Sequence, residues 1–268
     1  MNFPGKNRLR HWFWILTFKH PWLRVALTRA LIPSRDMDVR IFGANLHINT
    51  REEIGLWRAS RAANESIIFR DEAASLLNLA LLMQPGDTFV DAGANVGLYS
   101  SVLSRFRNAF PQTNCFAIEP NPRTAERLRR SVADHGVTVL NIGLSDRAGD
   151  LAFESGVTSG VFRVAPAPGG TNGFIVPCQR LDALPFGEGN LVVKIDVEGH
   201  EWPVLQGAQG LFDAERIKVI YLDGFTGSEI PAFLRQRGFT LFEGRTLVRC
   251  EAPDYSLLGV HRTRLLDG

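Results

Sequence analysis

From residue 88 onward, short apolar runs alternate with segments whose apolar residues recur at helical spacing, and short loops join them. The run LVVKID at 191–196 is apolar on both sides, which is typical of a parallel strand covered by helices on both faces. Repeated β–α units of this kind predict an α/β fold with a doubly wound, mostly parallel, Rossmann-like sheet. The predicted strands of this sheet are 88–91, 114–119, 137–142, 191–196 and 218–223.

Helices are predicted between these strands. Asn121 and Pro122 have the residue types of a helix cap and a first helical position, and Gly136 lies beyond the end of that helix. Ser228 and Gly238 frame another helix in the same way. The remaining predicted helices of this part of the chain are 98–107 and 202–209.

Two further segments differ from the repeated β–α pattern. Residues 239–243 and 246–250, joined by a Gly-Arg pair, predict a C-terminal antiparallel hairpin. The segment 155–173 is rich in Gly, Pro, Ser and Thr and has no period. We therefore expect it to be an irregular insertion, either a surface loop or a lid over the site.

The first third of the chain has a different organisation. Residues 1–33 predict helical pieces interrupted by prolines, and 39–42 with 46–48 predict two strands around a Gly-Ala-Asn turn. Residues 65–83 carry apolar side chains at helical spacing. We predict an N-terminal helical extension with a β-hairpin, residues 1–63, followed by one α/β domain, residues 64–268.

The composition is that of a globular protein, with 45% hydrophobic and 22% charged residues. A net charge of +2 is too small to indicate nucleic acid as a partner. The three cysteines are widely spaced and form no C-x-x-C pair, so the sequence predicts neither a disulfide framework nor a zinc site. These features favour a reducing, cytoplasmic location.

The N-terminal segment HWFWILTF, residues 11–18, follows three basic residues and is similar to the start of a signal peptide. Lys19, His20 and Pro21 interrupt it, and no small-residue cleavage site follows. Two interpretations stay open for residues 1–32. They are a helix that packs its aromatic side chains on the domain, or a peripheral helix that lies on a membrane surface.

The turn after the first strand of the α/β domain reads D-x-G-x-N-x-G over residues 91–97. A dinucleotide fingerprint has a middle glycine that admits a pyrophosphate, whereas here that position is Asn95. Asp91 would repel a pyrophosphate but suits a cofactor with positive charge, such as S-adenosylmethionine. A tight turn without a ligand is the alternative.

Polar residues also follow the second and third predicted strands. Glu119 lies 22 residues after Gly97, where a carboxylate can accept hydrogen bonds from the two hydroxyls of a ribose. This position indicates a nucleoside without choosing between cofactors. After the third strand, Asn141, Ser145 and Asp146 come where an adenine would lie, although Ser-Asp is also ordinary turn chemistry.

The fourth strand ends in alternating charged residues, Lys194, Asp196, Glu198 and His200. They share one face as long as the chain stays extended. Three interpretations of these four residues stay open. The first is an acid/base site, the second is a set of ligands for a divalent metal, and the third is a structural ion pair in which Lys194 neutralises a neighbouring carboxylate.

The strings DAGANVG, IEPNP, NIGLSD and above all KIDVEGHEWPVLQGA, in this order and spacing, resemble the FkbM family of S-adenosylmethionine-dependent methyltransferases. The resemblance covers about residues 64–250. It implies a seven-stranded methyltransferase fold and methyl transfer to a hydroxyl oxygen of a sugar, glycolipid or polyketide-type acceptor. The cofactor-binding residues that it implies are Asp91, Gly93, Asn95, Gly97, Glu119, Asn121, Ser145 and Asp146.

Methyl transfer to an alcohol needs a group that removes the hydroxyl proton. We predict His200 as this base, because its ordinary pKa lies near neutrality, with Asp196 or Glu198 to orient it or to hold the acceptor. As an alternative, Asp223 joins these two carboxylates in a Mg²⁺ site. The rival functions are a nicotinamide-dependent oxidoreductase and a catalytically inactive, cofactor-binding adaptor at a membrane.

Overall fold

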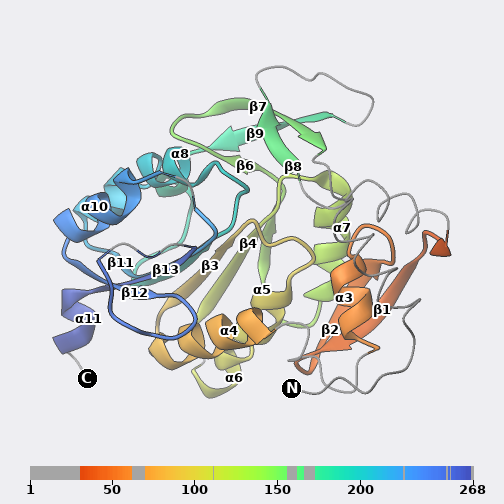
Figure 1. Ribbon diagram of the computed structural model, residues 1–268, viewed down its shortest axis with the longest axis horizontal. Coiled ribbons are helices and arrows are strands. Elements are labelled where there is room, and N and C mark those ends of the chain that lie inside the picture. The colour runs from red at the N-terminus through yellow and green to blue at the C-terminus, as the bar shows by residue number, and fades with distance from the viewer. Residues whose placement is uncertain are drawn as a thin grey trace, which may run out of the picture.

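The computed structural model describes residues 31–61, 70–110, 112–155, 162–165, 173–225, 227–251, 253 and 255–266. The predictions for the N-terminal aromatic segment therefore lie outside the described residues. Figure 1 shows a large central sheet with helices packed on both sides and a smaller sheet at the top of the view. Within the described part of the chain, no helix is long and apolar enough to cross a membrane.

The central sheet has seven strands in the order β12-β13-β11-β10-β3-β4-β5. Strands β11, β10, β3, β4 and β5 pair in parallel, and β13 pairs antiparallel with β11 and β12. The strands that follow β3 in the chain, β4 and β5, lie toward one edge of the sheet. The strands that follow β10 lie toward the other edge. The strands are β3 (Thr88–Ala92), β4 (Asn114–Ile118), β5 (Thr138–Leu140), β10 (Leu191–Ile195), β11 (Ile217–Asp223), β12 (Phe239–Glu243) and β13 (Ser256–His261).

Both faces of the central strands are buried, as the apolar run at 191–196 predicts. Side chains alternate between two core clusters. Phe89 and Val192 lie with α4 and α5 in one cluster, whereas Val90 and Val193 lie with α8, α9 and α10 in the other. The helices are α4 (Arg70–Leu82), α5 (Leu98–Leu103), α6 (Phe106–Ala109), α7 (Pro122–Ser131), α8 (Glu201–Gln206), α9 (Gln209–Asp213), α10 (Glu229–Gln236) and α11 (Arg262–Leu266).

Two predicted helices are each divided in the structure. The segment 98–107 forms α5 and α6, and the segment 202–209 forms α8 and the start of α9. The predicted cap of α7 is confirmed, since Asn121 accepts hydrogen bonds from the backbone N–H groups of Arg123 and Thr124. Ser228 precedes α10 as predicted but makes no side-chain capping bond.

The predicted N-terminal hairpin is confirmed. Strands β1 (Asp36–Ile41) and β2 (Ala44–Asn49) pair antiparallel and are followed by α3 (Ile54–Ala59). Their buried side chains, among them Ile41 and Leu46, belong to the same core cluster as those of α4 and α5. The hairpin thus packs directly on the α/β domain, and the division of the chain at residue 63 stays a prediction.

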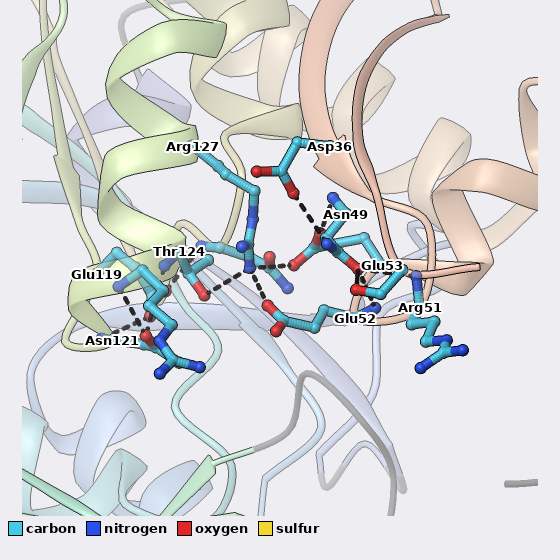
Figure 2. Close-up of polar contacts among 12 residues, drawn as sticks. Asp36, Asn49, Arg51, Glu52, Glu53, Glu119, Asn121, Thr124 and Arg127 are labelled. Carbon is cyan, nitrogen blue, oxygen red and sulfur yellow. Dashed lines mark hydrogen bonds and ion pairs between the residues drawn. The ribbon is translucent and has the colours of Figure 1, made fainter. Parts of the chain in front are cut away.

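A buried arginine joins this hairpin to α7. Figure 2 shows Arg127 extending from α7 toward Glu52 and Glu53, with Asn49 and Asp36 beyond them. Arg127 Nη2 donates to Glu53 Oε1 at 2.9 Å and also pairs with Glu52. The backbone N–H of Asn49 donates to Glu53 Oε2 at 2.6 Å. This network fixes the hairpin against the helix that begins beside Glu119.

The prediction of an irregular insertion at 155–173 is wrong in part. In a four-stranded sheet of order β6-β9-β7-β8, β7 ends at the first residue of this segment, β8 lies within it and β9 begins directly after it. Gly149 and Ser155 lie in β7 and Pro177 lies in β9, and such residues weaken the strand pattern of a sequence. The strands are β6 (Gly143–Leu144), β7 (Gly149–Ser155), β8 (Phe162–Ala165) and β9 (Phe174–Gln179), and 156–161 with 166–172 lie outside the described residues.

The predicted C-terminal hairpin is correct in its first strand and wrong in its second. Strand β12 pairs with β13, whereas 246–250 is not a strand and contacts β12 by one bridge, Phe242 to Arg249. The carboxylate of Glu243 explains the difference. It accepts hydrogen bonds from Thr246 N at 2.8 Å and from Ser256 Oγ at 2.8 Å, and the second bond ties the start of β13 to the end of β12. The segment 246–250 still runs along β12, where Glu243 N donates to Val248 O and Cys250 N donates to Leu241 O.

Candidate active site

A cavity of about 680 Å³, counting the space open to solvent at its mouth, lies where β3, β4 and β10 end. Its position is the point where the strand order reverses, at which α/β sheets bind their ligands. The cavity is lined by Gly93, Asn95, Ile118, Glu119, Pro120, Ile142, Leu144, Phe153, Val164, Asp196, Val197, Glu198 and His200.

The glycines of the turn after β3 are needed by the fold itself. A Cβ at Gly93 would lie 1.8 Å from the carbonyl oxygen of Asp196, and one at Gly97 would lie 2.6 Å from Leu128 Cδ1. Both glycines have a positive φ, as does Asn95 between them, with φ 50°. Gly93 therefore allows two strand-end loops to touch, while Gly97 admits a side chain of α7.

Asp91 and Lys194 form a buried ion pair behind this turn. Asp91 is 0% exposed, and its Oδ2 accepts hydrogen bonds from Ser100 N at 3.1 Å and from Ser100 Oγ at 2.7 Å. Lys194 Nζ lies 3.2 Å from Asp91 Oδ1 and 3.5 Å from Asp196 Oδ2, and donates to Gly93 O at 3.1 Å. The cavity lining in the described part of the chain does not include Asp91, so its contact with a cofactor stays a prediction.

The ion pair decides the charge state of Lys194. Burial alone would lower the pKa of this ammonium, but the carboxylates of Asp91 and Asp196 hold the pKa above its ordinary value. Lys194 thus stays cationic and ties the turn after β3 to the loop after β10. Of the three interpretations of the fourth strand end, the structural ion pair is present, although Asp91 is its nearest partner.

Glu119 forms part of the cavity wall with most of its side chain buried. Its Oε2 accepts from Asn95 N at 3.0 Å and its Oε1 accepts from Asn121 N at 2.9 Å. Burial raises the pKa of Glu119 to about 7, against the opposing effect of these N–H donors. The side chain of Asn121 is used in the cap of α7, so it supports Glu119 from behind through its own backbone N–H.

Three polar side chains of the β10 loop reach the cavity. These are Asp196, Glu198 and His200, and the chain does not stay extended between them, since Glu198 and Gly199 have φ values of 53° and 94°. The prediction of one face formed by an extended strand is therefore wrong, but the turn still gathers the three groups. Burial raises the pKa of Asp196 to about 6, partly offset by Lys194.

His200 begins α8 and contacts the loop after β6. Its Nε2 lies 3.0 Å from Ser145 Oγ, and Ser145 Oγ donates to Asp146 Oδ1 at 3.1 Å. Burial lowers the pKa of His200, whereas Asp146 raises it. Ser145 and Asp146 are not among the described residues that line the cavity. Their predicted place near an adenine stays untested.

Residues 91–241 match the model of the "Methyltransferase FkbM domain", which is more than half of the chain. The chain belongs to the FkbM methyltransferase family. Membership confirms the resemblance of its motifs and favours the methyltransferase over the nicotinamide-dependent oxidoreductase.

Two curated FkbM relatives match in sequence. The hexuronic acid methyltransferase AglP of Haloferax volcanii is 32% identical over 174 residues, which are 63% of this chain and 66% of that protein. The methyltransferase sdnD of Sordaria araneosa is 39% identical over 89 residues, which are 31% of each chain. The chain thus spans just under two thirds of the first relative and about a third of the second.

A solved FkbM structure, the methyltransferase from Methylobacillus flagellatus KT, superposes with a TM-score of 0.44 at 15% identity. The match covers 77% of this chain and 58% of that one.

The structure does not show the predicted Mg²⁺ site among the residues that it describes. Among the residues that the structure describes, no three His, Cys, Asp or Glu side chains are grouped to hold a metal ion. The ammonium of Lys194 lies beside Asp196, and Tyr221 donates its hydroxyl proton to Asp223 Oδ1 at 3.3 Å. These contacts occupy carboxylates that the metal would need.

Sequence reasoning missed the apolar wall of the cavity. Ile142 and Leu144 follow the third predicted strand, so strand-end position could have found them. Phe153 and Val164 come from β7 and β8 of the second sheet, whose strands were not predicted. The second sheet therefore closes the cavity opposite the turn after β3.

Proposed function

We propose that this chain is an S-adenosylmethionine-dependent methyltransferase that acts on a hydroxyl group of a sugar, glycolipid or polyketide-type acceptor. The observation that carries the proposal is the composition of one cavity. A wall of Gly93, Asn95 and Glu119 suits a nucleoside cofactor, and Asp196 and His200 lie in the same cavity. Membership of the FkbM family supports the same reaction.

The residues of this cavity fit the cofactor in hydrogen bonding. Glu119 uses one acceptor position on each oxygen for the N–H groups of Asn95 and Asn121. An ionised carboxylate has about four acceptor positions, so both oxygens can still accept from the hydroxyls of a ribose. The apolar side chains of Ile142 and Leu144 offer a surface for a flat base.

The charges of the site also fit a cationic cofactor. Asp196 and Glu198 line the cavity and Asp91 lies behind its floor, while Lys194 is the cation that pairs with two of them. When bound, the cofactor supplies a methyl group already activated by a sulfonium. A surplus of carboxylates favours that positive charge and disfavours a pyrophosphate.

His200 is the residue we assign to proton removal. The lowered pKa keeps its imidazole neutral near pH 7, the form that can accept a proton. Asp196 and Glu198 are assigned to hold the acceptor hydroxyl or to orient His200. In this arrangement the protein supplies approach geometry, a proton acceptor and exclusion of water, with the second sheet covering the site.

One relative indicates which class of acceptor to test first. AglP is a hexuronic acid methyltransferase, so acidic sugars are the first acceptors to test. Phe153 and Val164 leave the cavity wall apolar on one side. That wall suits the face of a sugar ring as well as a polyketide-type acceptor.

Transfer of a labelled methyl group from S-adenosylmethionine to hexuronic acids, neutral sugars, glycolipids and polyketide-type alcohols tests the proposal. We expect product in at least one class, unchanged turnover with EDTA, and binding of S-adenosylhomocysteine but not NAD by titration calorimetry. His200→Ala should lower turnover about 10²–10⁴-fold with S-adenosylhomocysteine affinity unchanged. Binding of NAD alone would reject the proposal, and full activity of His200→Ala would reject the assigned base.

A further inference from the structure

The imidazole of His200 is bonded to a hydroxyl that is itself bonded to a carboxylate. Ser145 Oγ donates to Asp146 Oδ1 at 3.1 Å and lies 3.0 Å from His200 Nε2. A serine hydroxyl has a single proton. Because that proton is used in the hydrogen bond to Asp146, the hydroxyl oxygen can interact with Nε2 only by accepting a hydrogen bond from an Nε2–H group. Nε2 then carries the imidazole proton, and Nδ1 keeps a free lone pair.

The hydroxyl is held rigidly for this contact. Ser145 is 4% exposed, and its backbone N–H donates to Gln179 O at 3.0 Å. A Cβ at Gly207 would lie 2.1 Å from the Ser145 carbonyl oxygen. The backbone of Ser145 is therefore packed against the end of α8, the helix that His200 begins. Loop and helix keep the hydroxyl and the imidazole at a fixed separation.

We propose that Ser145 and Asp146 are positioning residues that hold His200 in the Nε2-protonated tautomer, so that Nδ1 receives the proton of the acceptor hydroxyl. The acceptor O–H bond breaks and an N–H bond forms at Nδ1. The acceptor oxygen keeps the electron pair, which it would share with the methyl carbon, while the electron pair of the broken carbon–sulfur bond would stay on the cofactor sulfur as a thioether. The imidazolium later returns its proton to solvent.

Charge supports this arrangement. Asp146 stabilises the positive charge that His200 gains, in agreement with its effect of raising the histidine pKa. Two cations lie near this carboxylate. Arg147 Nη1 is 3.9 Å from Asp146 Oδ2, and Arg180 Nη1 donates to the Asp146 carbonyl oxygen at 3.4 Å while its guanidinium pairs with Asp182. The carboxylate thus stays available to Ser145.

This inference rests on the proposed role of His200 as base, but its central test needs no turnover. Full-length protein labelled with ¹⁵N-histidine is measured by long-range ¹H–¹⁵N NMR, and His200 is assigned by the signals lost in His200→Gln. We expect the Nε2-protonated tautomer in the unchanged protein and a mixture of tautomers in Ser145→Ala and Asp146→Asn. Asp146→Asn should also lower the pKa of His200, because a carboxylate that raises it is removed.

Two further variants act as controls. Ser145→Thr keeps the hydroxyl and should keep the tautomer, and Asp150→Asn removes the same charge from the exposed start of β7 and should change neither readout. Turnover should fall in Asp146→Asn by less than in His200→Ala. A His200 tautomer and pKa that stay the same in Ser145→Ala and Asp146→Asn would overturn the inference even if His200→Ala is inactive. Full activity of His200→Ala would instead reject the base.

Discussion

Gly93 and Asp196 touch through their main chains, because a Cβ at Gly93 would come within 1.8 Å of the Asp196 carbonyl oxygen. The turn after β3 and the loop after β10, which both line the cavity, are thus packed together at these two residues. Asp196 N donates to Ala92 O at 3.0 Å directly beside this contact. The geometry of the candidate site therefore depends on residue 93 being a glycine, which has no side chain.

We expect Gly93→Ala to separate these loops. The substitution adds an overlap with backbone to the strain of an alanine at φ 77°, which alone costs about 1–3 kcal/mol. Thermal unfolding should occur at a lower temperature, and calorimetry should show weaker binding of S-adenosylhomocysteine. Gly199→Ala is the control, since it has the strain of φ 94° but open space among the described residues. Equal losses in both variants would show that strain and not the loop contact matters.

The buried ammonium of Lys194 provides the second prediction. Lys194→Met leaves Asp91 without its cation at 0% exposure, and breaking such a buried pair costs about 3–5 kcal/mol. Urea denaturation should measure this loss. The double variant Asp91→Asn, Lys194→Met should be more stable than Lys194→Met alone, because the unpaired charge is removed. A double variant no better than the single one would contradict the pairing.

Much of the fold follows from local patterns in the sequence. The run at 191–196 is buried on both faces as predicted, and Asn121 with Pro122 begins α7 as predicted. The strand at 256–261 was missed because its place is set by Glu243, which bonds to Ser256 across the loop. Such a contact between distant residues leaves no periodic signal.

Sequence patterns predicted which residues belong to the candidate site better than they predicted what each residue does. Strand-end position alone gathers Glu119, Asp196 and His200 around one cavity. Pairing of Asp91 with Lys194 could not be predicted in the same way, because it depends on β3 lying beside β10 with these two residues in register. Sequence spacing suggested Asp196 or Glu198 as the partner, and Asp196 is confirmed as a second partner at 3.5 Å from Lys194 Nζ.

Glu119 should make stability depend on pH. Its pKa is about 7 in the folded chain against an ordinary value of 4.5, so between these values the folded state binds more protons than the unfolded state. The contribution of Glu119 to stability therefore falls as the pH rises through this window and is constant above it. The difference in unfolding free energy between the unchanged protein and Glu119→Gln should show this slope. The exposed Glu126→Gln should not, and a flat difference for Glu119→Gln would contradict the buried, proton-binding carboxylate.

Arg127 should hold the N-terminal hairpin on α7. In Arg127→Met, the buried Glu53 loses its cation, and removing one partner of a buried pair costs about 3–5 kcal/mol. Hydrogen exchange should then become faster at the amides of β1 and β2 more than at those of β3 and β10. Arg129→Met is the matched control, because Arg129 contacts the exposed Glu126 at 3.5 Å and lies half-exposed itself. If exchange instead rises equally over the whole sheet, the hairpin unfolds together with the α/β domain and has no independent attachment through Arg127.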